Sequence, residues 1–92
     1  MIQSFADEET RELFLTGHSR RWGNLARIAL RRLQALDFAS TLADLTEPPG
    51  NRLEKLGGDR SGFWSIRIND QFRICFRWED GDVREVGIIN YH

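Results

Sequence analysis

The chain has 92 residues, 40% of them hydrophobic, and a formal net charge of −1 at pH 7. This length provides one modest hydrophobic core, so we expect a single domain over residues 1–92, with any functional site in a surface groove. The charge balance argues against a protein that holds nucleic acid by overall charge alone, and the single cysteine, Cys75, excludes an internal disulfide framework. The charged N-terminal segment lacks the apolar stretch of a signal peptide or membrane span, which makes the cytoplasm the expected compartment.

The N-terminal half predicts a short strand and two helices. Residues 1–5 alternate as an edge strand does. Asp7 is a good N-cap for a first helix, and Gly17 suits the left-handed end of that helix. A second helix is predicted over residues 22–37, where apolar residues recur at helical spacing. Its apolar positions are Leu25, Ile28, Ala29, Leu33 and Leu36.

The C-terminal half predicts an antiparallel sheet. Residues 46–51 form a loop because of their proline and glycine content, residues 52–56 are a brief strand candidate, and residues 57–62 form a glycine-rich flexible loop. From Trp64 to Trp78 the apolar residues occupy even positions, as expected of strands that bury one face. The odd positions of the same segment hold Arg67, Arg73 and Arg77.

The two turns of this sheet decide which side chains share a face. A turn of odd length after Asn69 keeps the even positions of its two strands on one face and the odd positions on the other. The three arginines, all at odd positions, then share one face. We expect residues 79–81 to form a three-residue loop with Gly81 left-handed, which keeps the odd positions together again. Tyr91 then joins the arginine face, and the terminal His92 can turn to either side.

Two helices followed by consecutive strands indicate an α+β fold: an antiparallel-rich sheet of about four to five strands with the two N-terminal helices packed on one face. The predicted core joins the apolar face of the sheet to the second helix. It consists of Ile66, Ile68, Ile74, Phe76 and Val86 against Leu25, Ile28, Leu33 and Leu36.

The cations of this chain are mostly arginine. Of its thirteen lysines and arginines, Lys55 is the one lysine. Residues 20–32 contain several arginines and no acid, whereas residues 1–16 are mainly acidic. A guanidinium meets phosphate in two parallel hydrogen bonds, which an ammonium cannot do, although ordinary surface ion pairing is an alternative explanation. The resulting RNA-binding candidates are Arg20, Arg21, Arg27, Arg31, Arg60 and Arg67.

The sequence lacks the cysteine, histidine and glycine–lysine motifs of metal and nucleotide sites, so we expect no cofactor and no metal. RNA cleavage without a metal requires a base for the ribose 2′-hydroxyl, an acid for the departing 5′-oxygen, and cations around the phosphate. The candidates for these roles are Arg73, Tyr91, His92 and Glu54. Each also has a structural explanation: a solvated sheet arginine, a strand-end aromatic, a frayed terminus and a surface ion pair, respectively.

Several sequence blocks carry a family resemblance. The run PPGNRLEKLGGDRSGFWSIRINDQFRICFRW, together with RRW at residues 20–22 and the terminal Tyr91-His92, resembles the HigB family of toxins from bacterial type II toxin–antitoxin systems, within the RelE/ParE superfamily. The resemblance implies a compact antiparallel sheet backed by two helices and a ribosome-dependent endoribonuclease activity on translated mRNA. It also implies neutralisation by a HigA-type antitoxin with a helix-turn-helix fold.

The same resemblance implies roles for individual residues. Arg73 matches the arginine that stabilises the scissile phosphate, Tyr91 the near-terminal tyrosine that orients the nucleotide, and His92 the terminal histidine that is the candidate acid. Glu54 stands where better-understood members carry a histidine, and is the candidate base; the roles of Glu54 and His92 can be exchanged. Gly57 stands where those members carry a lysine, so we expect weak or selective cleavage.

Two other functions fit the same sequence. The first is a non-catalytic inhibitor that resembles ParE toxins acting on DNA gyrase, because a shared fold does not fix function. The second is a module that binds ribosomal RNA through the arginines of residues 20–31 and inhibits growth without cleavage, with strongly salt-dependent contacts.

Overall fold

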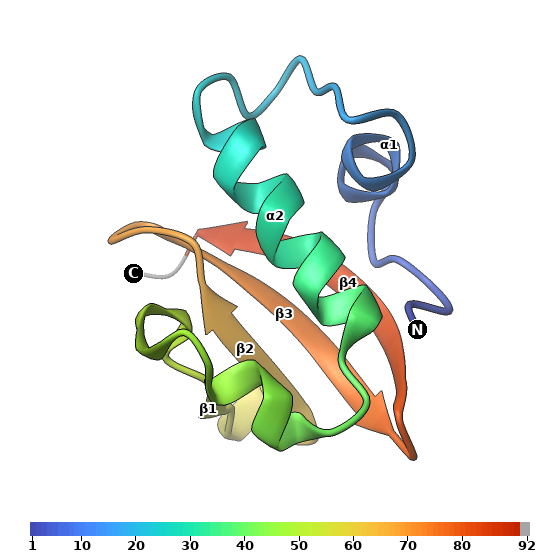
Figure 1. Ribbon diagram of the computed structural model, residues 1–92, viewed down its shortest axis with the longest axis vertical. Coiled ribbons are helices and arrows are strands. Elements are labelled where there is room, and N and C mark those ends of the chain that lie inside the picture. The colour runs from blue at the N-terminus through green and yellow to red at the C-terminus, as the bar shows by residue number, and fades with distance from the viewer. Residues whose placement is uncertain (91–92) are drawn as a thin grey trace.

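The computed structural model describes residues 1–90. Two helices precede the sheet (Figure 1). They are α1 (Glu8–Thr16) and α2 (Leu25–Phe38). The four strands are β1 (Glu54–Lys55), β2 (Phe63–Arg67), β3 (Phe72–Glu79) and β4 (Asp82–Asn90). They lie side by side in chain order, each antiparallel to its neighbour. The predicted α+β fold is therefore confirmed.

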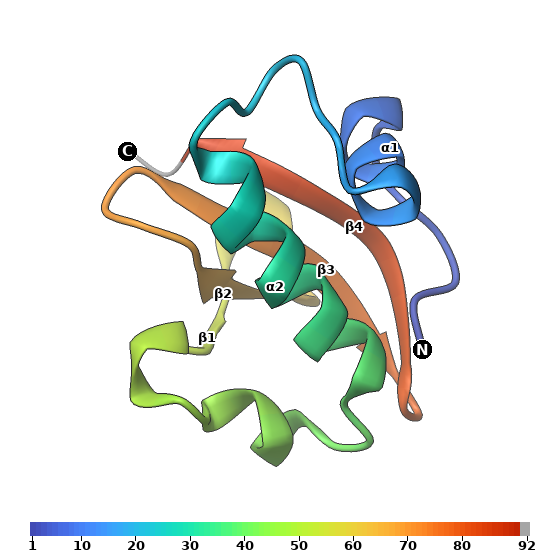
Figure 2. The same cartoon turned by 45° about the horizontal axis from the view of Figure 1, so that its top comes forward.

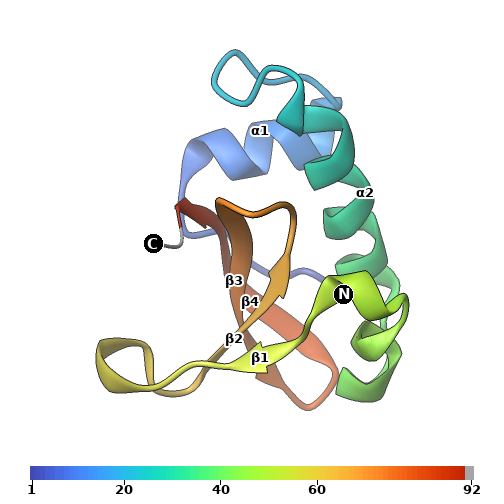
Figure 3. The same ribbon diagram turned by 90° about the vertical axis from the view of Figure 1, so that its left-hand side faces the viewer.

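The connection between α2 and β2 is built from short 3-10 turns. These turns are Leu42–Thr46, Pro49–Asn51 and Gly58–Arg60. The brief strand β1 lies between the second and third of them and forms the edge of the sheet beside β2 (Figure 3). The loops predicted on both sides of this short strand are thus present, with more local turn structure than the sequence indicates.

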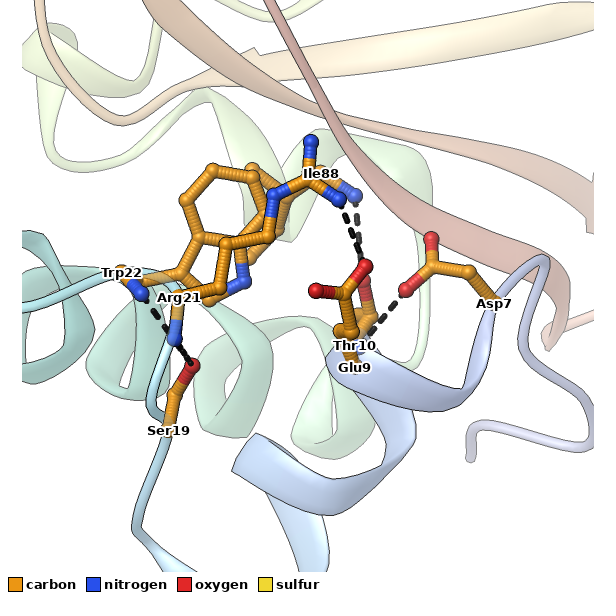
Figure 4. A network of polar contacts seen from close by, with 7 residues as sticks. All are labelled: Asp7, Glu9, Thr10, Ser19, Arg21, Trp22 and Ile88. Atoms are coloured by element: carbon orange, nitrogen blue, oxygen red, sulfur yellow. Dashed lines mark hydrogen bonds and ion pairs between the residues drawn. The ribbon is translucent and has the colours of Figure 1, made fainter.

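Helix α1 begins and ends as its sequence predicts. The Asp7 carboxylate accepts a hydrogen bond from the Thr10 backbone N–H at 2.7 Å, and Gly17 ends the helix with a φ of 76°. Thr10 also ties the helix to β4, because its buried hydroxyl oxygen accepts a hydrogen bond from the Ile88 backbone N–H at 3.3 Å (Figure 4). A Cβ at Gly87 would lie 3.1 Å from the Ala6 Cβ and from a carboxylate oxygen of Asp7, so a larger residue there would require these side chains to move by a few tenths of an ångström.

The core lies between α2 and the even-numbered residues of β2 and β3, which we call the even face of the sheet; α2 crosses this face diagonally (Figure 2). Ile66, Ile74 and Phe76 are fully buried there, as predicted. Ile28 was expected in this core and is instead 42% exposed. The buried stripe of α2 runs through Ala29, and a residue one position away is turned by about 100° around the helix. The full set of buried residues on α2 is Ala29, Leu33 and Leu36.

The register of β2 and β3 follows the predicted parity. Ile66 pairs with Ile74 and Arg67 with Arg73, so odd-numbered residues share the opposite side, which we call the odd face. The next turn differs from the prediction. Glu79 pairs directly with Asp82, so the turn has two residues and not three.

This two-residue turn suits the twist of the strands. Asp80 and Gly81 have φ values of 51° and 88°, as a hairpin turn of the primed type requires. Next to the turn, odd positions of β3 pair with even positions of β4, as Arg77 does with Arg84. A bulge near Glu85, whose φ is 53°, shifts the register by one residue. Beyond it odd positions pair with odd positions, as Arg73 does with Ile89. The predicted place of Tyr91 on the arginine face, like that of His92, lies outside the described residues.

The N-terminal segment covers the outer edge of β4 without forming a continuous strand. Ile2 and Phe5 form isolated parallel bridges with Val83 and Val86. The Ile2 backbone N–H also donates to the Asp37 carboxylate at 2.8 Å, which connects this segment to the end of α2. The edge-strand prediction for residues 1–5 is thus right in position and too regular in structure. No helix within residues 1–90 is long and apolar enough to cross a membrane.

Candidate functional site

Arg73 is the centre of a buried polar cluster on the odd face. The sequence suggests an arginine on a solvated face, and this expectation is wrong, because the side chain is only 5% exposed. Its Nε donates a hydrogen bond to Ser65 Oγ at 2.7 Å, and its Nη2 donates to the backbone carbonyls of Ser65 and Arg52. The chain that leads into β1 supplies one of these acceptors, the Arg52 carbonyl. A buried charged group needs such partners, because an unpaired one is costly.

Glu54 lies beside this guanidinium. Its Oε2 is 3.8 Å from Arg73 Nη2, and its side chain is 48% exposed. The sheet register brings the two together, because Glu54 pairs with Ser65 across β1 and β2, and Arg73 lies one strand farther on. A carboxylate in contact with solvent thus borders a buried cation. Of the four predicted catalytic residues, the structure brings these two together; Tyr91 and His92 lie outside the described residues.

Arg60 and Cys75 extend the cluster. Arg60 is exposed, and its Nη1 lies 3.6 Å from the Sγ of Cys75, which is 2% exposed. Burial raises the pKa of the Cys75 thiol, and the nearby Arg60 charge opposes that rise. The thiol is therefore protonated at neutral pH, as expected of a small packed residue rather than a nucleophile. The contact places Arg60, a predicted RNA-binding residue, on the odd face near Arg73.

The other two arginines of β2 and β3 have partners of their own. Arg67 pairs directly opposite Arg73 in the register and forms an ion pair with Asp70 in the following turn. Arg77 lies 4.5 Å over the ring of Phe63, and its Nε is 2.7 Å from a carboxylate oxygen of Glu85. The odd face thus carries a row of arginines whose positions are fixed by local contacts.

The remaining predicted RNA-binding residues lie elsewhere. Arg27 and Arg31 are on the exposed side of α2, the helix that covers the even face. Arg21 forms an ion pair with Glu9 of α1, and its guanidinium lies 4.6 Å over the ring of Trp22 (Figure 4). With Arg20 it lines a polar hollow between α1 and the following loop, to which no strand contributes. The structure therefore divides the predicted basic set between two surfaces. The helical surface has Arg20, Arg21, Arg27 and Arg31, and the odd face has Arg60 and Arg67.

Ser65 is a further member of the cluster around Arg73, and the sequence assigns it no role. It stands at an odd position of β2 and accepts hydrogen bonds from Arg73. The sequence feature that points to Ser65 is a small hydroxyl residue at an odd position of β2, and the strand register places it between Glu54 and Cys75. Within residues 1–90, no group of three or more histidine, cysteine, aspartate or glutamate side chains is arranged to hold a metal ion.

The fold is the α+β fold seen in solved structures of YoeB toxins. A chain in the crystal structure of the heterotetrameric YoeB–YefM toxin–antitoxin complex from Staphylococcus aureus superposes with a TM-score of 0.63 and 19% identity, over 100% of this chain and 95% of that one. The YoeB dimer from the same organism gives a TM-score of 0.61 over 99% of this chain and 94% of the other. At this identity the similarity shows the fold alone.

The sequence identifies the family among proteins of this fold. The family model described as the RelE-like toxin of the type II toxin–antitoxin system HigB matches residues 3–92, so the chain belongs to that family and the predicted resemblance is confirmed. Toxin HigB-1 of Vibrio cholerae is 51% identical over 51 residues, and Endoribonuclease HigB of Proteus vulgaris is 38% identical over 61 residues. The first match covers 55% of this chain and 54% of the relative, and the second covers 66% and 65%. The chain thus spans about half the length of the first of these relatives.

Proposed function

We propose that this chain is a toxin that cleaves mRNA on the ribosome, in the bacterial cytoplasm, with its own side chains and no metal ion. The observation that carries the proposal is the Glu54 carboxylate 3.8 Å from the buried guanidinium of Arg73. An acceptor of protons beside a fixed cation is what attack on a phosphodiester requires. The name of the Proteus vulgaris relative, an endoribonuclease, supports the same reaction class.

The proposed reaction uses four side chains. Glu54 takes the proton of the ribose 2′-hydroxyl, and the 2′-oxygen forms a bond to phosphorus as the bond from phosphorus to the 5′-oxygen breaks. Arg73 stabilises the negative charge that develops on the phosphate oxygens. His92 gives a proton to the departing 5′-oxygen, and Tyr91 orients the nucleotide. The products are a 2′,3′-cyclic phosphate and a 5′-hydroxyl, which can be detected chemically.

The two basic surfaces receive different proposed partners. Arg60 and Arg67, on the same face as Arg73, hold the phosphates on both sides of the cleaved bond. The helical surface, with Arg20, Arg21, Arg27 and Arg31 in α2 and the loop before it, contacts ribosomal RNA or a HigA-type helix-turn-helix antitoxin. We favour a contact in which the antitoxin binds the arginines of residues 20–31. An antitoxin bound there would keep the toxin off the ribosome by steric exclusion alone.

The test is cleavage of a defined mRNA on translating ribosomes by the purified toxin, with the new 5′ ends mapped. Glu54→Gln keeps the side-chain shape and removes the base, so we expect a loss of about a hundredfold or more in rate. Glu79→Gln is the matched control, since Glu79 also pairs with an arginine, Arg84 at 3.0 Å, at the far end of β3. Equal rates for Glu54→Gln and the control would exclude Glu54 as the base.

A non-catalytic inhibitor is the second candidate. One observation favours it: Arg73 is hydrogen-bonded to Ser65 and Arg52, as a purely structural arginine would be. In that case the toxin arrests growth while cellular mRNA stays intact, and gyrase or the ribosome is the target. Mapping mRNA ends after expression in bacteria separates this candidate from the ribonuclease.

A further inference from the structure

Two atoms of Ser65 accept hydrogen bonds from the Arg73 guanidinium. Ser65 lies in β2 with no exposed surface. Its Oγ accepts from Arg73 Nε at 2.7 Å, and its backbone carbonyl accepts from Arg73 Nη2 at 3.3 Å. The guanidinium is planar, so acceptors at two of its nitrogens fix both the position of the group and the rotation of its plane.

The sheet register explains why a serine occupies this position. Ser65 pairs with Glu54 in β1 and with Cys75 in β3, and Arg73 reaches it along the diagonal of the odd face. A larger side chain would take the space of the buried guanidinium. An alanine would fit and would remove the Oγ acceptor of a buried charged donor. A small residue with a hydroxyl meets both conditions.

Resting on the proposed ribonuclease function, we infer that Ser65 is a positioning residue that holds the Arg73 guanidinium in the plane in which it meets the scissile phosphate. Ser65 itself, fully buried beneath the guanidinium, does not touch the RNA. It acts through Arg73 by holding the cation next to Glu54, 3.8 Å away, so that base and cation face the same phosphodiester. Misplacing such a group by about 1 Å costs on the order of a hundredfold in rate.

The first test is a double-mutant cycle measured as cleavage rate at saturating ribosome concentration. Ser65→Ala should lower the rate on the order of a hundredfold, with little change in the concentration needed for half saturation. In an Arg73→Lys background, Ser65→Ala should add almost nothing. A wild-type rate for Ser65→Ala, or losses that multiply in the double variant, would overturn the inference.

Two controls separate positioning from general destabilisation. Val83→Ala removes buried volume at the far end of β4, opposite Trp78, and should lower stability without lowering the saturated rate of the folded protein. An equal loss of rate in Val83→Ala would overturn the inference. If Ser65→Ala does not fold, Ser65→Cys keeps the size and weakens the acceptor, so an intermediate rate is expected and an unchanged rate would contradict the role.

A second measurement does not depend on cleavage. Hydrogen exchange of the Arg73 Nε–H, followed by NMR with ¹⁵N-labelled arginine, should be about tenfold faster in Ser65→Ala than in wild type, the change that corresponds to one ordinary hydrogen bond. Unchanged exchange would show that Ser65 does not hold the guanidinium. If the wild-type protein leaves ribosome-bound mRNA intact, the proposed function fails, and this measurement still decides whether Ser65 orients Arg73.

Discussion

On the even face of the sheet, Ile66 and Ile74 are fully buried in the apolar core. On the odd face, Ser65 and Arg73 are buried almost as deeply, but they are polar and are joined by a hydrogen bond. The even face gains its stability from non-directional removal of apolar surface from water. The odd face depends on directed contacts, each of which fails if one partner is lost. A substitution on the even face should therefore change mainly stability, and one that breaks the contacts of Arg73 on the odd face should change stability and chemistry together.

The largest effect is expected on the even face, at Ile74. Ile74→Ala removes a fully buried side chain and leaves a cavity, so the free energy of unfolding should fall by about 2 to 5 kcal/mol, as measured by urea denaturation. The molecules that remain folded should cleave RNA at the wild-type rate. Ile28→Ala, on the same helix-and-sheet layer but 42% exposed, should cost less than about 0.5 kcal/mol. A loss at Ile28 as large as that at Ile74 would contradict the observed placement of α2.

The next effect is expected on the odd face, at Arg73. Arg73→Ala removes the donor of the bonds to Ser65 and Arg52, so stability should fall by roughly 2 kcal/mol in urea and cleavage should be lost. This differs from the behaviour of an exposed sheet arginine, which contributes little to stability. Arg84→Ala is the control, because Arg84 pairs with Glu79 at the surface. If Arg73→Ala cleaves normally while it unfolds more easily, Arg73 is purely structural.

The difference between the two faces also explains what the sequence could predict. Hydrophobic periodicity identified the even face, because Ile66, Ile74 and Phe76 alternate with polar residues and burial follows that alternation. The same alternation made Arg73 look exposed. Arg73 contacts Glu54 of the short strand β1 and the Arg52 carbonyl in the turn before it, and the position of this segment depends on tertiary contacts that local periodicity does not encode.

Turn chemistry shows the same limit on a smaller scale. The dipeptide Asp80-Gly81 is a strong signal for a two-residue turn, and the prediction of a three-residue loop over residues 79–81 is wrong. The structure reaches the predicted parity of the strands by another route, a two-residue turn followed by a bulge at Glu85. A bulge in mid-strand has no clear local sequence signal at this glutamate, so the predicted result was right and its cause was not.

A smaller effect is expected at Cys75, where the odd face couples to pH. Burial raises the pKa of this thiol above its ordinary value of 9.0, so its contribution to stability is complete below that value and is lost as pH rises toward the folded-state pKa. Cys75→Ala should cost about 1 kcal/mol at pH 7, and in urea unfolding the difference in stability from wild type should narrow as the pH rises above 9.0. A difference that widens with pH would mean that the thiolate is the favoured form.

The smallest effect on stability is expected at Arg67, and it tests whether the odd face binds RNA beyond Arg73. Arg67 is partly exposed and paired with Asp70 in the adjacent turn, so Arg67→Ala should change the free energy of unfolding by less than about 0.5 kcal/mol. If Arg67 contacts a phosphate, the same change should weaken RNA binding for all sequences and reduce the slope of log affinity against log salt by about 1. Arg84→Ala, which removes a more exposed arginine at the far end of the sheet, should leave that slope unchanged. Equal slopes for wild type and Arg67→Ala would show that Arg67 does not contact RNA. A reduced slope with unchanged stability would show that a substitution on the odd face can weaken RNA binding without affecting folding, whereas substitutions of the buried residues on the even face act through stability.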